Sequence, residues 1–168
     1  MNILSKTMIA CVGLALAACT QPEYLQGVDG NGAGSGAYGS GSAQDPTSPL
    51  YFQQTVGDRV LFAVDQSTIS PEGAATLDGQ AQWLMTNTAY SAIIEGHADE
   101  QGTREYNLAL GARRANAVQE YLLSKGVAGN RMKVVSYGKE RPLEVCSDEA
   151  CYNKNRRAVT VVSAIPNS

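Results

Sequence analysis

The chain has 168 residues, which is enough for one ordinary domain and additional segments. Its 13 basic and 16 acidic side chains give a formal net charge of −3, and it contains one histidine and four cysteines. This mild acidity argues against nucleic acid as a partner, because nucleic-acid binding favours a basic surface.

Residues 1–18 have the features of an export signal. Lys6 is their only charged side chain, and it precedes an apolar run from Met8 to Ala18. That run is too short to span a bilayer comfortably, and it fits a secretory signal peptide. The end of this signal and the next residue read L-A-A-C, which resembles a bacterial lipobox. The motif predicts that Cys19 is lipidated and becomes the new N-terminus. The alternative is an ordinary signal peptide followed by a chance cysteine.

Residues 19–49 are predicted to form a flexible tether. Seven glycines alternate there with serines and alanines, and large apolar side chains are few. Such a segment buries too little apolar surface to offset the entropy of ordering. As a flexible coil it reaches roughly 30 Å, enough to let a folded domain leave a membrane surface. It also fits a plain spacer with no further role.

The folded part is predicted to span residues 50–168 and to begin with a strand and a helix. The apolar run R-V-L-F-A-V, residues 59–64, predicts the strand. Ser70 then offers a helix cap and Pro71 suits the first helical position. The helix is expected to run to about Asn87, with one apolar face made of Ala74, Leu77, Ala81 and Leu84.

A second strand and helix follow. Ile93 and Ile94 indicate a short buried strand over residues 91–95, and a polar loop leads to Thr103. The Thr103 hydroxyl suits the N-cap because it can accept a hydrogen bond from an unpaired amide of the first turn. Gly126 is a stop signal. The expected buried face of this helix consists of Leu108, Gly111, Ala115, Val118 and Leu122.

Two more strands complete the pattern. Residues 131–137 and 157–163 are rich in valine, and an acidic stretch around Asp148 and Glu149 between them predicts a loop or short helix. The order β-α-β-α-β-(α)-β predicts a sheet covered by helices, with right-handed crossovers. The pattern alone also allows a small open α/β sheet.

Three polar side chains around the second helix form a candidate site. Asp99 lies in the loop before the helix, and Arg114 follows Asn107 by seven residues, about two turns, so both share a helix face. Together they would offer an acceptor, an amide and a guanidinium fork. A fork binds carboxylates bidentately, so the set suits a ligand that carries an ammonium and a carboxylate. The alternatives are a loop acid and a solvated arginine without a ligand.

These motifs resemble a known family. The sequence G-H-A-D-x-x-G-T-x-x-Y-N-x-x-L-x-x-R-R-A-x-x-V-x-x-Y-L, with V-S-Y-G-K-E-R-P and N-R-R-A-V further on, is similar to the peptidoglycan-binding domain at the C-terminus of outer-membrane protein A. Within that family the chain looks most like the peptidoglycan-associated lipoproteins. The resemblance covers roughly residues 58–163.

The resemblance implies an α+β fold and a binding role. It implies a mixed four-stranded sheet with helices packed on one face. Relatives use the residues matching Asp99 and Arg114 to hold the diaminopimelate of the peptidoglycan stem peptide, and those matching Asn107 and Asp65 as further contacts. It also implies a non-enzymatic outer-membrane anchor of the Tol–Pal system, without a cofactor, that binds TolB through the same surface. Thr20 agrees, because an aspartate there would indicate inner-membrane retention.

Two positions depart from the family pattern, and one basic cluster has no assigned role. Ala98 stands where threonine is common, and Gly111 where serine is common. Gly111 lies inside a helix, where glycine is expected to cost about 1 kcal/mol relative to alanine. The basic cluster of Lys154, Arg156 and Arg157 fits either a solvated strand end or contacts to ligand carboxylates or TolB.

The cysteines indicate an oxidising compartment. Cys11 leaves with the signal and Cys19 is the lipid site, so Cys146 and Cys151 remain as a pair. In an exported protein this pair predicts a disulfide. Two free thiols are the alternative, and the spacing fits zinc poorly.

Two other functions are possible in principle. An enzyme acting on the cell wall would use His97 with Glu95, Asp99 or Glu100 as a general base. No G-x-S-x-G nucleophile motif and no second histidine for a metal are present in the sequence. The other alternative is a stator-type or generic envelope anchor that shares the domain but lies outside the Tol–Pal system. The stator type would need a retained transmembrane helix, and the lipobox argues against one.

Overall fold

The computed structural model describes residues 41–145 and 147–165. Its four strands form one sheet in the order β1-β4-β2-β3. β2 (Tyr90–His97) pairs in parallel with β3 (Met132–Gly138), whereas β4 (Arg157–Ala164) is antiparallel to β2 and to β1 (Arg59–Leu61). The predicted mixed α+β sheet is therefore confirmed.

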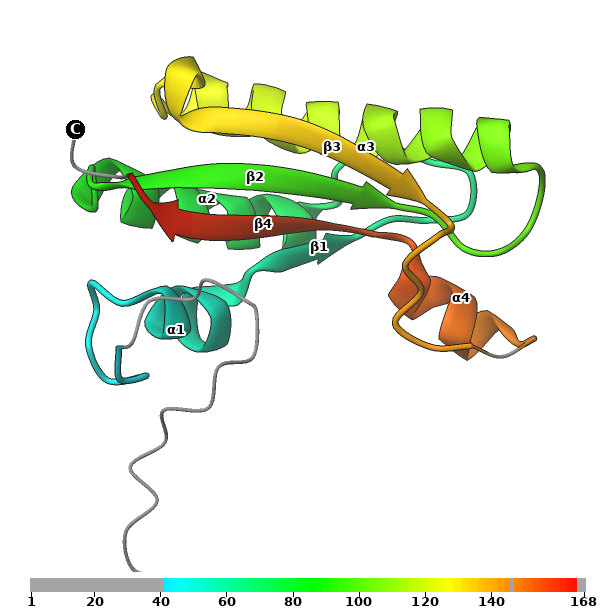
Figure 1. Ribbon diagram of the computed structural model, residues 1–168, viewed down its shortest axis with the longest axis horizontal. Helices are drawn as coiled ribbons and strands as arrows, with labels where there is room; N and C mark the ends of the chain where they lie inside the picture. Colours follow the sequence, from blue (N-terminus) through cyan, green and yellow to red (C-terminus); the bar gives the residue numbers. More distant parts are fainter. Residues whose placement is uncertain (1–40, 146, 166–168) are drawn as a thin grey trace, which may run out of the picture. The chain divides into compact units, whose positions relative to one another are not determined.

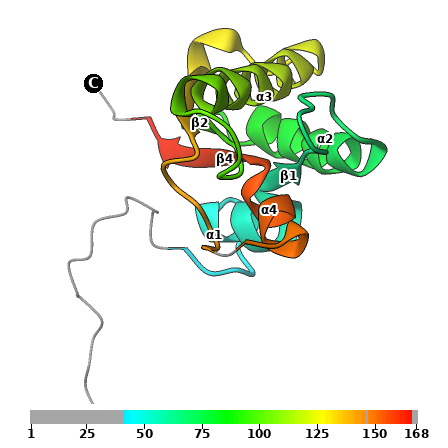
Figure 2. The same ribbon diagram turned by 90° about the vertical axis from the view of Figure 1, so that its right-hand side faces the viewer.

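Two long helices lie on the same side of this sheet (Figure 2). α2 (Pro71–Thr86) and α3 (Arg104–Ser124) both begin as predicted, because Ser70 accepts a hydrogen bond from the Gly73 amide and Thr103 accepts one from the Tyr106 amide. Gly126, with a φ of 99°, follows the end of α3. The N-caps therefore fix where the loop before each helix ends and the helix begins.

The remaining helical elements are short. α1 (Pro49–Tyr51) and the wider turn η1 (Phe52–Gly57) precede β1, and the turn η2 (Gly129–Arg131) precedes β3. α4 (Glu149–Asn155) precedes β4, and α1 and α4 lie near opposite ends of that strand (Figure 1). The acidic stretch before β4 is therefore a helix.

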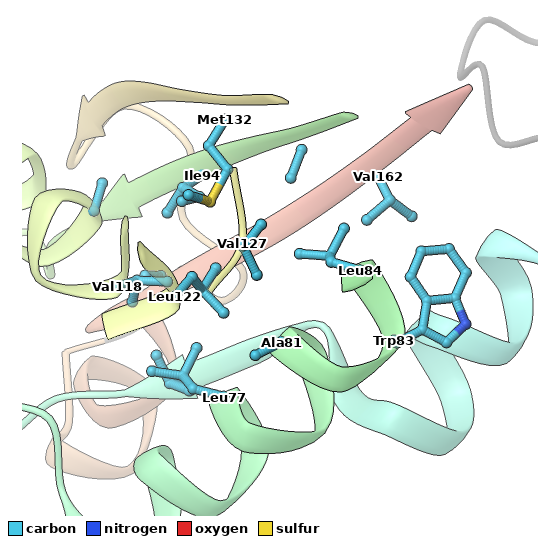
Figure 3. Packing of buried hydrophobic residues seen from close by; sticks show 14 of the residues in the cluster. Leu77, Ala81, Trp83, Leu84, Ile94, Val118, Leu122, Val127, Met132 and Val162 are labelled. Atoms are coloured by element: carbon cyan, nitrogen blue, oxygen red, sulfur yellow. The ribbon is translucent and has the colours of Figure 1, made fainter. Parts of the chain in front are cut away.

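The core lies between the two long helices and the sheet (Figure 3). From α2 it takes Leu77, Ala81 and Leu84, as predicted; α3 supplies Ala115, Val118 and Leu122, and the sheet supplies Ile94 and Val162. Burial of each large apolar side chain stabilises the fold by about 1.5–3 kcal/mol. These contacts explain why the helical periodicity of the sequence located α2 and α3 correctly.

Three expectations differ from the structure. Leu108 is 49% exposed, and Leu110 takes the inward position instead. The first strand was expected to reach residue 64, but β1 ends at Leu61. The next two carbonyls, of Phe62 and Ala63, accept hydrogen bonds from the side chains of Arg156 and Arg114 instead of from a neighbouring strand. Some residues before position 50 also pack into described structure, since the Ser48 hydroxyl donates to the Ser42 carbonyl and caps α1.

α3 and β2 meet at two glycines. A Cβ atom on Gly96 would lie 1.8 Å from the Gly111 carbonyl oxygen, and one on Gly111 would lie 2.5 Å from the Ser136 hydroxyl oxygen. Real Cβ atoms do not approach other atoms this closely, so both positions require glycine in this packing. The expected helix cost of Gly111 is therefore offset by the close approach that it permits.

Candidate functional site

A cleft of about 290 Å³ opens where the β1–α2 loop, the β2–α3 loop and the first turns of α3 meet. The residues that line it are Val64, Asp65, Asp99, Gln101, Gly102, Tyr106, Asn107 and Leu110. Three of the four predicted ligand-binding residues, Asp65, Asp99 and Asn107, are thus brought together in one cleft. The fourth, Arg114, is not among the lining residues.

Asp99 is held from two sides. Its Oδ1 accepts a hydrogen bond from the Gln101 amide at 3.2 Å, and its Oδ2 pairs with Arg156 Nη1 at 3.1 Å. The Asp99 side chain is 12% exposed and that of Arg156 only 4%. The carboxylate is therefore fixed in orientation while one side remains open to the cleft.

Arg114 is completely buried beneath the loops that form the cleft. Its Nε donates to the Gln66 carbonyl at 2.8 Å, its Nη1 to the His97 carbonyl at 2.8 Å, and its Nη2 to the Ala63 carbonyl at 3.2 Å. Burial lowers the pKa of Arg114 to about 10, so the group is still charged at neutral pH. The sequence suggested a free guanidinium fork, whereas each nitrogen here already has a backbone partner.

Asn107 supports the loop that leads into α3. Its Nδ2 donates to the Gln101 carbonyl at 2.6 Å, and the residue is 1% exposed. Asn107 is nevertheless one of the residues that line the cleft. Asn107 therefore fixes the loop shape as well as contributing to the lining.

Asp65 has a left-handed backbone conformation, with a φ of 59°. Asp tolerates this region better than most residues, because its short polar side chain bonds locally. The Tyr106 hydroxyl donates to Asp65 Oδ1, and this bond raises the pKa of Tyr106. Tyr106 was not singled out from the sequence, although the Y-N pair of the quoted motif contains it.

The cleft combines an acidic rim with buried positive charge. Asp65 and Asp99 supply the carboxylates, and the guanidinium groups of Arg114 and Arg156 lie behind them. Charges act more strongly where water is excluded. The arrangement complements a ligand that carries both an ammonium and a carboxylate.

The basic cluster before β4 divides into three environments. Lys154 forms an exposed ion pair with Glu144 at 2.6 Å. Arg156 turns inward to Asp99, and its Nη2 also pairs with Glu149 of α4. Arg157 is buried and donates to the Arg141 carbonyl at 3.1 Å. Of the three, Arg156 alone pairs with a residue that lines the cleft.

His97 lies at the end of β2 and does not line the cleft. It is 1% exposed, its ring stacks on Tyr137 at 5.5 Å, and neither ring nitrogen has a hydrogen-bond partner among the described residues. Glu95 Oε2 is 3.6 Å from Nε2, beyond hydrogen-bond distance. This position does not present the ring to a substrate in the cleft as a general base.

We expect the single histidine to stay neutral well below its usual titration range. Burial, reinforced by the charges of Arg157 and Arg141, lowers the pKa of His97 to about 3. The unfolded chain, with a pKa near 6.5, therefore takes up the proton first, and stability falls as the pH falls from about 6.5 toward 3. The His97 Cε1 proton shift, followed by NMR from pH 8 to pH 4.5, should remain flat. A midpoint near 6.5 would contradict the buried placement.

Several predicted features lie outside the described residues, namely the signal peptide, Cys19, most of the tether, and Cys146. Cys151 is buried in α4, and its predicted pairing with Cys146 stays a prediction. Over residues 41–145 and 147–165, no helix has the length and apolar character needed to cross a membrane. The same residues contain no cluster of three or more potential metal ligands.

Comparison with known proteins identifies the class. The model of the OmpA family matches residues 61–161. The chain belongs to the OmpA family. Within it, the chain is similar to the peptidoglycan-associated lipoprotein of Rhizobium meliloti (strain 1021), with 54% identity over 92% of this chain and 86% of the relative.

Solved structures agree with this placement. The peptidoglycan-associated lipoprotein of Burkholderia pseudomallei is 40% identical and superimposes with a TM-score of 0.64, over 72% of this chain and 98% of that one. The C-terminal domain of Helicobacter pylori MotB gives a TM-score of 0.60 at 21% identity, over 64% of this chain and 85% of that one. At this low identity, the similarity to MotB shows only that the two proteins share a fold.

Proposed function

We propose that this chain binds peptidoglycan noncovalently through the Asp65–Asp99 cleft and tethers the outer membrane to it. The observation that carries the proposal is the acidic rim over two buried guanidinium groups. The diaminopimelate of a stem peptide presents an ammonium and a carboxylate on one carbon, which matches this charge pattern. The relatives from Rhizobium meliloti and Burkholderia pseudomallei are both named peptidoglycan-associated lipoproteins, which supports the same ligand.

The two ends of the ligand would meet different parts of the cleft. Asp99 is the acceptor for the ammonium, with Asp65 as a second contact and Asn107 as an accessory one. The carboxylate would be attracted by the positive charge of Arg114, which has two N–H groups beyond the three already engaged. This role needs no bond making, and the proposal is a binding function without catalysis.

The anchor itself would lie at the other end of the chain. A lipid on Cys19 would hold the chain in the outer membrane, and the domain would stand in the periplasm. The 23 residues from Cys19 to Gly41 would reach roughly 25 Å if they formed a flexible coil. The structure describes the chain from Gly41 onward, and the 19–49 tether stays a proposal.

We also propose, from the resemblance to the lipoprotein members, that this anchor acts in the Tol–Pal system during cell division. TolB would then compete with peptidoglycan for the surface around the cleft. Tyr106, Leu108 and Val64 support a protein contact there, because each is at least 44% exposed on or beside the cleft rim.

A disulfide between Cys146 and Cys151 would tie down the loop before β4. This loop ends in α4, whose Glu149 pairs with Arg156 behind the cleft. A bridge over so short a loop adds about 2 kcal/mol of stability. Intact-mass measurement of exported protein, before and after thiol alkylation, should find neither thiol reactive. Alkylation of both would refute the bridge.

The binding proposal is tested by cosedimentation of the full chain, in detergent, with purified sacculi. Asp99→Asn should reduce binding at least tenfold, because it removes the charge that receives the ammonium. Glu100→Gln is the matched control, since it makes the same change one residue away and does not line the cleft. Equal binding by both variants, each with an unchanged melting transition, would overturn the proposed site.

A further inference from the structure

A second hollow lies at the opposite end of α2 from the Asp65 loop. It has a volume of about 410 Å³, larger than the Asp65–Asp99 cleft, and lies between residues 46–56 and the C-terminal half of α2. We call it the aromatic groove. The stem-peptide site uses none of its residues.

The lining of the aromatic groove is uncharged. None of the nine described residues that form it is an acid, a lysine, an arginine or a histidine. They include two aromatic rings, two amides and two hydroxyls, from Tyr51, Trp83, Gln82, Asn87, Thr55 and Thr86. A charged ligand would lose its hydration here without gaining an opposite charge, so the lining favours a neutral, hydroxyl-rich one.

The floor of the groove is rigid. The Trp83 indole Nε1–H donates to the Pro46 carbonyl at 2.7 Å, and the Trp83 ring packs against Phe52 at 4.9 Å and Tyr90 at 5.1 Å. Trp83 is 5% exposed, so it forms the base, and the half-buried Tyr51 forms a wall. A fixed floor loses little freedom when a ligand binds.

Polar groups are also available around the rim. Gln82 and Thr55 are exposed, and within the described part of the chain no hydrogen bond engages either side chain. Asn87 uses its Nδ2 to bond the Trp83 carbonyl at 3.0 Å, which leaves its Oδ1 as an acceptor. Donors and acceptors thus surround an aromatic base.

We propose that the aromatic groove binds a neutral N-acetylated glycan strand. Sugar rings present C–H faces that pack on aromatic side chains, and their hydroxyl and acetamido groups pair with amides and hydroxyls. The volume lies in the range of ordinary ligand sites. This inference rests on the proposed function, because in peptidoglycan the glycan strand carries the stem peptides. One polymer would then contact the domain at both ends of α2, a helix of 16 residues and about 24 Å.

Gly79 offers a variant that fills the groove without disturbing the fold. It lies in α2 and borders the groove, and a Cβ there would be 3.4 Å from Val56 Cγ1, an ordinary contact. Glutamine is a better helix former than glycine. Gly79→Gln should therefore fold at least as stably as the wild type while its side chain occupies the groove.

The test is an NMR titration of the full chain in detergent with tetra-N-acetylchitotetraose. Trp83 is the only tryptophan, so its indole N–H gives one resolvable reporter. We expect a saturable shift of that signal, at least tenfold weaker binding in Gly79→Gln, and unchanged binding in Asp99→Asn. No shift, or equal affinity in Gly79→Gln, overturns the inference. An equal response to maltotetraose overturns the assignment to an N-acetylated glycan.

Sacculi separate this inference from the stem-peptide proposal. After an amidase removes the stem peptides, the wild type should still bind the glycan and Gly79→Gln should bind at least tenfold less. If peptide-free glycan is not bound while intact sacculi are bound in an Asp99-dependent way, the glycan inference fails and the stem-peptide site stands. If peptide-free glycan is bound and binding of intact sacculi does not depend on Asp99, the glycan inference stands and the stem-peptide site fails.

Discussion

Arg114→Met is expected to lower the free energy of unfolding by about 3 kcal/mol or more. The guanidinium donates to three backbone carbonyls, those of Ala63, Gln66 and His97, and methionine can replace none of these bonds. Each orphaned, partly buried carbonyl costs about 1 kcal/mol or more. Urea denaturation, followed by circular dichroism, measures the change.

Arg113→Met is the matched control. Arg113 is the preceding residue of α3 and is exposed, with its guanidinium carbon 5.9 Å from the centre of the Tyr106 ring. An exposed cation–π contact contributes at most about 1 kcal/mol, so this variant should remain close to the wild type. Equal unfolding midpoints for both variants would show that Arg114 does not hold the loops together.

The expected instability also decides how binding data should be interpreted. A loss of sacculus binding in an Arg114 variant combines any lost ligand contact with a collapsed β1–α2 loop. Arg114→Lys separates them only partly, because one ammonium cannot reproduce the planar three-carbonyl geometry. Asp99→Asn, which retains the size of the side chain and the acceptor oxygen, is the cleaner probe of the cleft.

The sequence predicted the architecture well because local signals agreed with the tertiary fold. Ser70 and Thr103 are helix caps that act within three residues, and the apolar period of α2 matches its buried face. Such signals need no knowledge of distant contacts. Leu108 was wrongly assigned to the buried face because it lies three residues before Gly111, a spacing that fits an apolar helical stripe, yet it is 49% exposed.

The candidate site was predicted only in part. Asp99 and Asn107 share a cleft, as expected from their spacing around the β2–α3 loop. The partners of Arg114 lie 48 and 51 residues earlier in the chain, at Gln66 and Ala63, so local spacing carries no information about them. The pairing of Arg156 with Asp99 spans 57 residues and follows from the place of β4 between β1 and β2.

Gly96→Ala is expected to destabilise the domain by about 3 kcal/mol or more, because its methyl group would overlap the Gly111 carbonyl. The ideal Cβ position is 1.8 Å from that oxygen, which belongs to the backbone of α3 and cannot rotate away. The helix must move off the sheet, and the core contacts of Ala115 and Val118 with the sheet would loosen with it. Thermal unfolding measures the effect. Gly79→Ala, whose Cβ would make an ordinary 3.4 Å contact with Val56 Cγ1, should instead be neutral or stabilising by up to about 1 kcal/mol.

Gly111→Ala tests the same contact from the helix side, where helix propensity and packing predict opposite signs. Propensity alone predicts a gain of about 1 kcal/mol. Packing predicts a loss of about 1–3 kcal/mol, since the new Cβ meets the Ser136 Oγ at 2.5 Å and the Gly96 carbonyl oxygen at 2.8 Å. Ser136→Ala removes the first contact and leaves the second, so the double variant should recover part of the loss. A gain in stability for Gly111→Ala would mean that α3 can shift away from β2 at little cost. The two glycines would then not determine the spacing between α3 and β2.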